Sequence, residues 1–272
     1  TVAIDVLHPT RRAEGIGYYG LSNNIASAIA PALAIYLLNI THNYNLLFWL
    51  AFLTSAIGLG INATLKLNPR ELIKDKPKIS LDRFFLLKGW SEGVSMMCLS
   101  FSHGVTATYV AIYGKETLNI SGGSAVFFML LSLGLILSRL VGSRTLRQGK
   151  ITQNASVGIL ISLCGYLMFA LLQNPIGYYC SAFIVGLGNG HMWPAYQTMF
   201  LNLAPHTQRG TANSSILISW DIGVGLGTLI GGAIAEHCGY QQAFIASALV
   251  NLIGIIIFFG YAKNDFLKNK LR

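Results

Sequence analysis

The chain has 272 residues, of which 53% are hydrophobic and only 11% are charged, and its mean hydropathy is +0.54. Soluble domains carry about 25% charged residues, so this composition excludes an ordinary soluble fold and favours a protein embedded in lipid. The net charge of +9 would suit nucleic-acid binding, but the basic residues are spread among connectors between apolar runs. We therefore expect membrane lipid as a partner and no nucleic acid.

Apolar runs near 20 residues recur along the chain, and each is long enough to cross a hydrocarbon core of about 30 Å. We expect an all-α polytopic membrane protein with eight transmembrane helices. In chain order these predicted spans are 16–38, 46–65, 89–113, 124–141, 156–172, 177–201, 214–235 and 244–261.

The basic residues predict the orientation of these spans. The connectors expected on one side hold Arg11, Arg12, seven basic residues between 66 and 88, Arg144, Arg147, Lys150, Arg209, Lys263, Lys268, Lys270 and Arg272. The opposite connectors hold only Lys115. Because positively charged connectors remain in the cytoplasm, we expect both ends of this chain to be cytoplasmic, in a bacterial inner (plasma) membrane. The polar connector 66–88 is expected to be a solvated linker that contacts lipid headgroups.

An internal repeat indicates how the helices are grouped. Shifted back by 197 positions, residues 209–235 align without a gap on residues 12–38. Both copies carry small residues at i, i+4 and i+8, namely Gly223, Gly227 and Gly231 in one and Ala26, Ala30 and Ala34 in the other. Such spacing lets membrane helices pack closely. The repeat pairs the first helix with the seventh, so the repeating unit has six helices.

A repeating unit of six helices predicts that this chain has three parts. Residues 1–65 would be the end of an N-terminal six-helix unit, residues 66–88 a cytoplasmic central loop, and residues 89–272 a complete C-terminal six-helix unit. We expect the intact protein to have twelve spans, of which this chain holds the last eight.

Two six-helix repeats joined by a basic loop resemble the major facilitator superfamily (MFS) of secondary transporters. Two local motifs carry the resemblance further. Gly142, Arg147, Gly149 and Lys150 match the C-terminal copy of the family's G-x-x-x-D-R-x-G-R/K loop, with Leu146 in place of Asp. Ala26, Ala30, Pro31 and Ala34 resemble the antiporter signature G-x-x-x-G-P-x-x-G, with alanine in place of glycine. The resemblance implies an MFS-type helical bundle, a gating loop at 142–150 and a substrate held between the two units.

Polar side chains inside the predicted spans are candidates for lining a substrate cavity, because burying them in lipid is costly. His103, Thr106 and Tyr109 fall roughly on one face of the third helix. In the sixth helix, glycines at 186, 188 and 190 and a proline at 194 would loosen the backbone at mid-membrane depth, and interrupted helices commonly line cavities. The remaining candidates are Asn189, His191, Trp193 and Gln197 there, and Asn24 in the first helix. The alternative is that the glycines only pack and that His191 bonds a neighbouring carbonyl.

Two acidic residues lie inside the predicted spans. Asp221 lies about two turns inside the seventh helix, where incomplete hydration favours a neutral carboxyl, so it is the candidate for proton coupling. The alternative is a scaffold hydrogen bond to a neighbouring helix end. Glu92 follows Lys88 by four residues, so we expect an ion pair between them at the membrane interface.

We therefore expect a secondary transporter that moves a small solute by alternating access, with protons as the coupling ion and efflux by antiport as the first hypothesis. Uptake of a sugar-like solute, proton-coupled or facilitated, is the alternative. An integral-membrane enzyme is a remote alternative, because no H-E-x-x-H or Walker motif occurs. The cysteines Cys98, Cys164, Cys180 and Cys238 stand singly without C-x-x-C spacing, so we expect neither a disulfide framework nor a metal site, and no cofactor.

Overall fold

The computed structural model of the chain describes residues 22, 26, 29, 30, 33–38, 40–64, 84–120 and 122–271. Every regular element among them is a helix, which confirms the predicted all-α class. The long helices are α3 (Tyr44–Ala63), α4 (Trp90–Glu116), α5 (Gly123–Arg147), α6 (Ile151–Leu171), α7 (Pro175–Leu203), α8 (Arg209–Cys238) and α9 (Tyr240–Ile257). Short elements are η3 (Leu87–Gly89), η4 (His206–Gln208), the π-helical turn η5 (Phe258–Ala262) and α10 (Lys263–Asn269).

Within the part of the chain that the structure describes, four helical stretches are apolar and long enough to cross a membrane, namely Tyr44–Ala63, Ile151–Leu171, Arg209–Cys238 and Tyr240–Asn269. Helices α4, α5 and α7 are of similar length, at 27, 25 and 29 residues, but carry more polar side chains. Of the first predicted span, 16–38, the described positions 22, 26, 29, 30 and 33–38 are helical. The helices therefore occupy the predicted spans.

The helices extend beyond the apolar runs because polar residues form their ends. Helix α7 begins at Pro175, and the Asn174 side chain before it accepts a hydrogen bond from the Gly177 amide at 2.7 Å. Gly149 ends α5 with a φ of 75°, a conformation that favours glycine, and its amide donates to the Leu146 carbonyl at 3.0 Å. Gly239, with a φ of 96°, alone joins α8 to α9.

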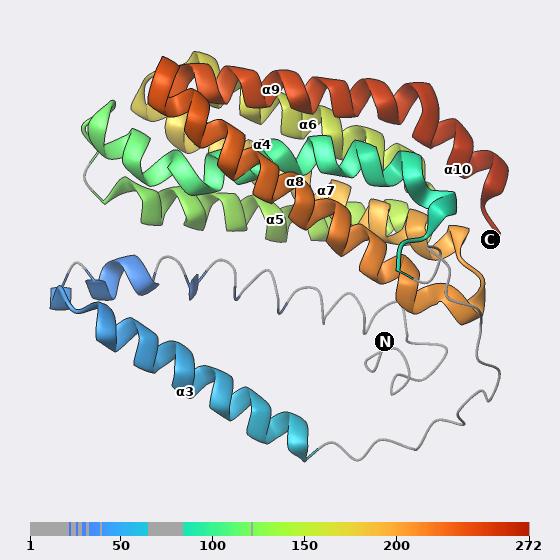
Figure 1. Cartoon of the computed structure of the whole chain (residues 1–272), viewed down its shortest axis with the longest axis horizontal. Coiled ribbons are helices and arrows are strands. Elements are labelled where there is room, and N and C mark those ends of the chain that lie inside the picture. The colour runs from blue at the N-terminus through green and yellow to red at the C-terminus, as the bar shows by residue number, and fades with distance from the viewer. Residues whose placement is uncertain are drawn as a thin grey trace.

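Helices α4 to α9 form one bundle, and α3 lies apart from it without a buried residue (Figure 1). Helix α7 packs between α5 and α6, while α4 packs against α8 and α9. Contacts between α6 and α9 and between α7 and α8 join these two groups. Helices α4 to α9 thus pack as one group, and the division of the chain into six-helix units stays a prediction.

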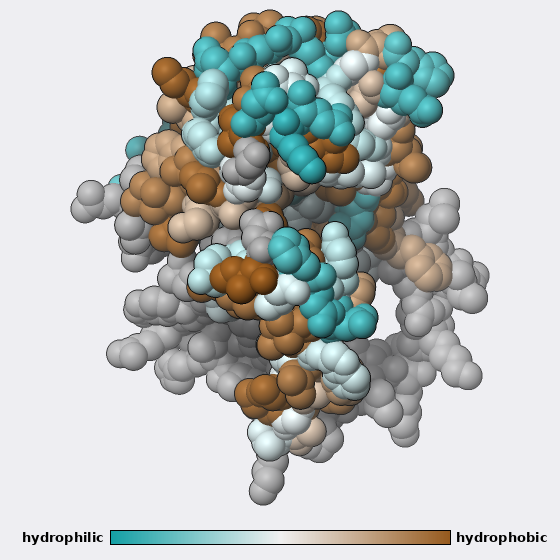
Figure 2. Space-filling model, turned by 90° about the vertical axis from the view of Figure 1, so that its left-hand side faces the viewer, coloured by the Kyte–Doolittle hydropathy of each residue, from teal (hydrophilic) through white to brown (hydrophobic). Residues whose placement is uncertain are grey.

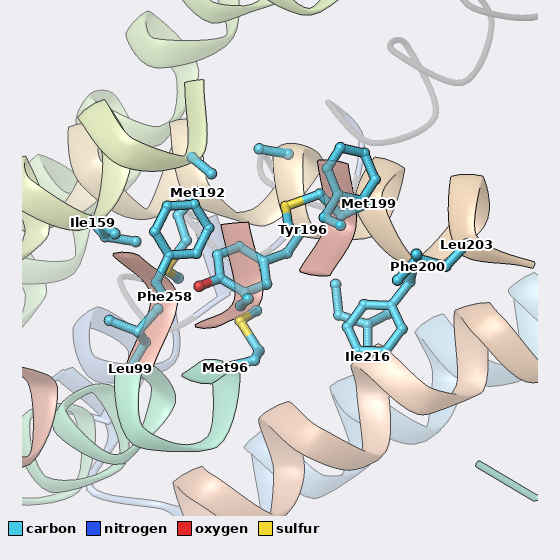
Figure 3. Packing of buried hydrophobic residues seen from close by; sticks show 14 of the residues in the cluster. Met96, Leu99, Ile159, Met192, Tyr196, Met199, Phe200, Leu203, Ile216 and Phe258 are labelled. Atoms are coloured by element: carbon cyan, nitrogen blue, oxygen red, sulfur yellow. The ribbon is translucent and has the colours of Figure 1, made fainter. Parts of the chain in front are cut away.

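Two clusters of buried side chains fill the bundle. One lies near α10 and includes Met96, Tyr196, Phe200 and Phe258 (Figure 3). The other lies toward the opposite end and is mainly aromatic, with the ring centroids of Phe169 and Phe244 4.6 Å apart. The interior is therefore well packed at both ends.

The outer surface of the bundle is apolar, which is the reverse of a soluble protein. Large side chains such as Leu229 and Ile176 are 72% and 70% exposed. Figure 2 shows hydrophilic side chains on the end of the bundle and hydrophobic side chains along its flanks. Lipid tails solvate such flanks, and water solvates the ends. The chain is an integral membrane protein.

Candidate functional site

Three half-buried rings from three helices form the candidate site. The His103 ring of α4 lies 5.1 Å from the Trp220 ring of α8, centroid to centroid, and the Trp193 ring of α7 lies 5.1 Å from Trp220 at an interplanar angle of 87°. Edge-on and tilted contacts of this kind are favourable for aromatic pairs. The rings remain partly accessible, so they can contact a solute.

A polar pair lies on the same two helices α7 and α8. Gln197 follows Trp193 by four residues, and its Nε2 donates to Asn213 Oδ1 at 3.1 Å. Both side chains are half-buried. Because residues four apart share a helix face, Gln197 lies one turn from the ring of Trp193. The site thus combines aromatic faces with an amide pair.

The other candidates of α4 have different surroundings. Tyr109 donates its hydroxyl to the Thr228 carbonyl of α8 at 2.8 Å, and so ties two helices together. Thr106 is buried, with 4% of its surface exposed. Neither lies in the ring cluster that His103 joins.

Asn189 and His191 lie in the seam between α6 and α7. Asn189 Oδ1 accepts from the Ser162 hydroxyl at 2.7 Å, and His191 Nδ1 lies 2.9 Å from Asn154 Oδ1. The Asn154 Nδ2 group donates to the His191 carbonyl at 2.8 Å. Their polar groups are therefore satisfied by α6, and as substrate contacts they stay a prediction.

The glycines do not interrupt α7, which is helical from Pro175 to Leu203. A Cβ atom on Gly186 would meet the Leu131 carbonyl of α5, and one on Gly188 would meet the Ser162 backbone of α6. The expected loosening of α7 is wrong, because these glycines allow its backbone to approach both neighbours.

The candidate gating loop is mostly helical. Gly142 and Arg147 belong to α5, and only Gly149 and Lys150 lie in the turn that follows. A Cβ on Gly142 would lie 2.6 Å from His191 Nδ1, so Gly142 packs against α7. The side chain of Arg147 lies outside the described residues.

The remaining candidates are placed as follows. Gly223, Gly227 and Gly231 face α4, where a Cβ would meet Met97, Phe101 and Val105, respectively. Ala26 and Ala30 are exposed and Ala34 is half-buried, while Asn24 and Pro31 lie outside the described residues. Asp221 is exposed on α8, and as the proton-coupling residue it stays a prediction.

Glu92 was misassigned from the sequence. Its side chain is fully buried, Oε2 accepts from the Ser91 hydroxyl at 3.1 Å, and Oε1 has no hydrogen-bond partner. Lys88 is exposed, and the ion pair expected between them is not formed. Trp220, Asn213 and Asn154 were also missed, although a polar or indole side chain within an apolar run is the signal that could have found them.

The comparisons with known proteins agree with this architecture. The family model described as Major Facilitator Superfamily matches residues 1–228 and 157–270. The chain belongs to the major facilitator superfamily. Members of this superfamily are transporters, so the family implies a small-molecule substrate.

Among curated MFS relatives, the staphylopine export protein of Staphylococcus aureus is 21% identical over 270 residues, which cover 94% of this chain and 67% of that protein. The multidrug resistance protein MdtG of Erwinia billingiae is 30% identical over 98 residues, covering 36% of this chain and 24% of that protein. A bacterial homolog of the human lysosomal transporter Spinster, in an inward-facing and occupied conformation, superposes with a TM-score of 0.64 at 16% identity, over 99% of this chain and 73% of that one. This last likeness supports the fold alone.

Proposed function

We propose that the chain belongs to a secondary transporter that exports a small solute by alternating access, driven by protons moving inward. The observation that carries the proposal is the family membership together with relatives named as exporters, among them a staphylopine exporter and a multidrug resistance protein. Alternating access requires two units that rock around a shared site. The closed bundle of α4 to α9 is suited to be one of them.

The parts of the chain follow from this proposal. Residues 89–272 form the C-terminal unit, residues 66–88 the central loop, and residues 1–65 the end of the N-terminal unit. The isolation of α3 from the bundle of α4 to α9 supports this division. We place the protein in an inner membrane with both ends of the chain in the cytoplasm.

The solute contacts the ring cluster of His103, Trp193 and Trp220 and the amide pair of Gln197 and Asn213. Aromatic faces attract flat or cationic organic groups, and the amides offer both a donor and an acceptor. All five side chains come from α4, α7 and α8 and are partly accessible, which allows contact without opening the core.

Transport by the full-length protein in inside-out vesicles tests the function. An acidic interior should drive accumulation of ethidium or staphylopine, because an exporter in this orientation moves solute inward in exchange for protons. Trp220→Ala should weaken the apparent affinity about tenfold, which corresponds to about 1.4 kcal/mol. Trp49→Ala is the matched control, since Trp49 lies on α3 and is 63% exposed.

Two results would contradict the proposal. Loss of solute from vesicles when the interior is acidified would indicate proton-coupled uptake instead of export. Equal effects of Trp220→Ala and Trp49→Ala on the apparent affinity would show that the ring cluster is not part of the substrate site.

A further inference from the structure

The cytoplasmic half of the proposed transporter buries one carboxyl that the proposed substrate site does not use. Glu92 lies in the first turn of α4 and has no exposed surface. Among the described residues, its one hydrogen bond to another side chain comes from Ser91, and Oε1 is buried without a hydrogen-bond partner. A buried ionised carboxylate requires a positive partner or several donors, and a protonated carboxyl does not. The surroundings of Glu92 therefore suit the protonated form.

The groups around Glu92 supply no compensating positive charge within the described residues. Asp265 of α10 acts on Glu92 as a second negative charge. The Tyr196 hydroxyl of α7 lies close enough to Glu92 for an electrostatic interaction, and it is hydrogen-bonded to Ser95 Oγ at 2.7 Å. Lys88 of η3 and Lys268 of α10 are exposed.

The apolar neighbours of Glu92 exclude water from one side. Met96 follows Glu92 by four residues, and the Tyr196 ring lies beside Met96 and Phe258 (Figure 3). Ser95, between them on α4, donates to the Gly254 carbonyl of α9 at 2.8 Å. Hydrogen bonds of Ser95, which lies about one turn after Glu92 on α4, thus join helices α4, α7 and α9 in the core of the bundle.

The other side of Glu92 leads to water. A surface pocket of about 240 Å³ lies between the start of α4 and the turn η5, and its lining includes Ser91, Tyr261, Asp265 and Lys268. This volume has room for several water molecules. Ser91 belongs to the pocket lining and also donates to Glu92, so its hydroxyl connects the pocket with the carboxyl. The π-helical turn η5 forms the opposite wall, and such turns are frequent at functional sites.

We propose that Glu92 is the proton-binding carboxyl of the transporter and that Ser91 passes its proton to this cytoplasmic pocket, an inference that rests on the proposed function. Ser91 gives its own hydroxyl proton to a water molecule in the pocket, which becomes hydronium, and Ser91 Oγ takes the proton of Glu92. One proton moves in total, and afterwards the Ser91 hydroxyl donates to the ionised Glu92. Loading requires the other access state, in which the units separate and water reaches the carboxyl.

Asp221 is the competing carboxyl. It is exposed on α8 in this state. Glu92 differs because its burial links its charge to the conformation of the bundle.

Infrared difference spectroscopy of the full-length protein in lipid tests the proposal with the proton itself as the ligand. The wild type should show the C=O stretching band of a buried protonated carboxylic acid at neutral pH, and Glu92→Gln should lack it. Asp221→Asn and Glu236→Gln should keep the band, the latter as a matched control because Glu236 is exposed at the end of α8. Absence of the band in the wild type, or its persistence in Glu92→Gln, would overturn the proposal.

Ethidium transport gives a second readout. Glu92→Gln should lose proton-driven accumulation while exchange of labelled for unlabelled ethidium without a gradient continues. A Glu92→Gln protein that still accumulates ethidium against a gradient would refute the assignment. If the wild type moves no solute, the proposed function fails, and the infrared band still decides whether Glu92 binds the proton.

Ser91→Ala keeps the carboxyl and removes the relay, so it serves if Glu92→Gln does not fold. After a rapid rise in pH, the carboxylic acid band of Ser91→Ala should fall more slowly than that of the wild type and reach the same final height. An unchanged rate of fall would show that Ser91 is not in the proton path, and loss of the band at neutral pH would show that Ser91 only holds the side chain in place.

Discussion

Gly225 and Gly227 of α8 differ in what an added methyl group would meet. A Cβ on Gly227 would collide with the Phe101 carbonyl of α4, whereas one on Gly225 would have nothing within 4 Å. Alanine forms helix better than glycine by about 1 kcal/mol, so Gly225→Ala should leave stability unchanged or raise it. Gly227→Ala should lower stability by about 1–3 kcal/mol, because two helix backbones must separate. Thermal unfolding in detergent measures both, and equal shifts would contradict close packing of α4 on α8.

For single residues, the sequence predicts the helix face on which a residue lies better than it predicts the residues that the side chain contacts. The i, i+4, i+8 pattern correctly selects Gly227 rather than Gly225 as the residue that faces a neighbouring helix, since position on a helix face follows from periodicity alone. The environment of Glu92 could not be predicted in this way. Its burial depends on α7, η5 and α10, which follow it by about a hundred residues or more, so the adjacent Lys88 gave the wrong partner.

At the scale of the element, α7 shows why glycines were misinterpreted. In water, glycine weakens a helix because it has more backbone freedom and no side chain to pack. In lipid, every backbone amide must remain bonded within the helix, so the same glycines instead allow close approach. Gly186 meets α5 and Gly188 meets α6, and the helix stays continuous between them.

The α6–α7 seam can be tested through Asn154, which donates to the His191 carbonyl and also meets the His191 ring. Asn154→Leu keeps the number and branching of the side-chain heavy atoms but removes both contacts. Interhelical hydrogen bonds in membranes contribute about 0.6 kcal/mol on average and at most about 1.7 kcal/mol, so we expect the free energy of unfolding to fall by an amount in this range. Denaturant unfolding in micelles measures this free energy.

Ser156→Ala is the matched control for Asn154→Leu, because the Ser156 hydroxyl donates to the Thr152 carbonyl of its own helix and bonds to no other helix that the structure describes. Ser156→Ala should lower the free energy of unfolding by less than Asn154→Leu does. An equal or greater loss would mean that the seam is held by packing, with no net contribution from the Asn154 bonds.

At the scale of the whole molecule, the helical class and the span positions follow from composition and hydropathy, since these depend on the bilayer more than on particular contacts. The candidate site was predicted in part. His103 and Trp193 both contact Trp220, and Gln197 bonds to Asn213. Trp220 and Asn213 come from α8, and no local pattern on α4 or α7 indicates which residues of another helix these side chains meet.

The orientation of the bundle supplies the last prediction. Because successive helices run in alternate directions, the turns 117–122 and 172–174 lie at one end, and the turn 148–150 lies with α10 at the other (Figure 1). The end with α10 carries Lys150, Lys263 and Lys268, which the positive-inside rule places in the cytoplasm.

In a variant without the native cysteines, a single cysteine at Asn119 or Asn174 should react in intact cells with a membrane-impermeant maleimide. One at Gln148, which is exposed next to Lys150, should react only after the cells are permeabilised. Labelling of Gln148→Cys in sealed cells, with Asn119→Cys protected, would invert the molecule and place the Glu92 pocket on the outside.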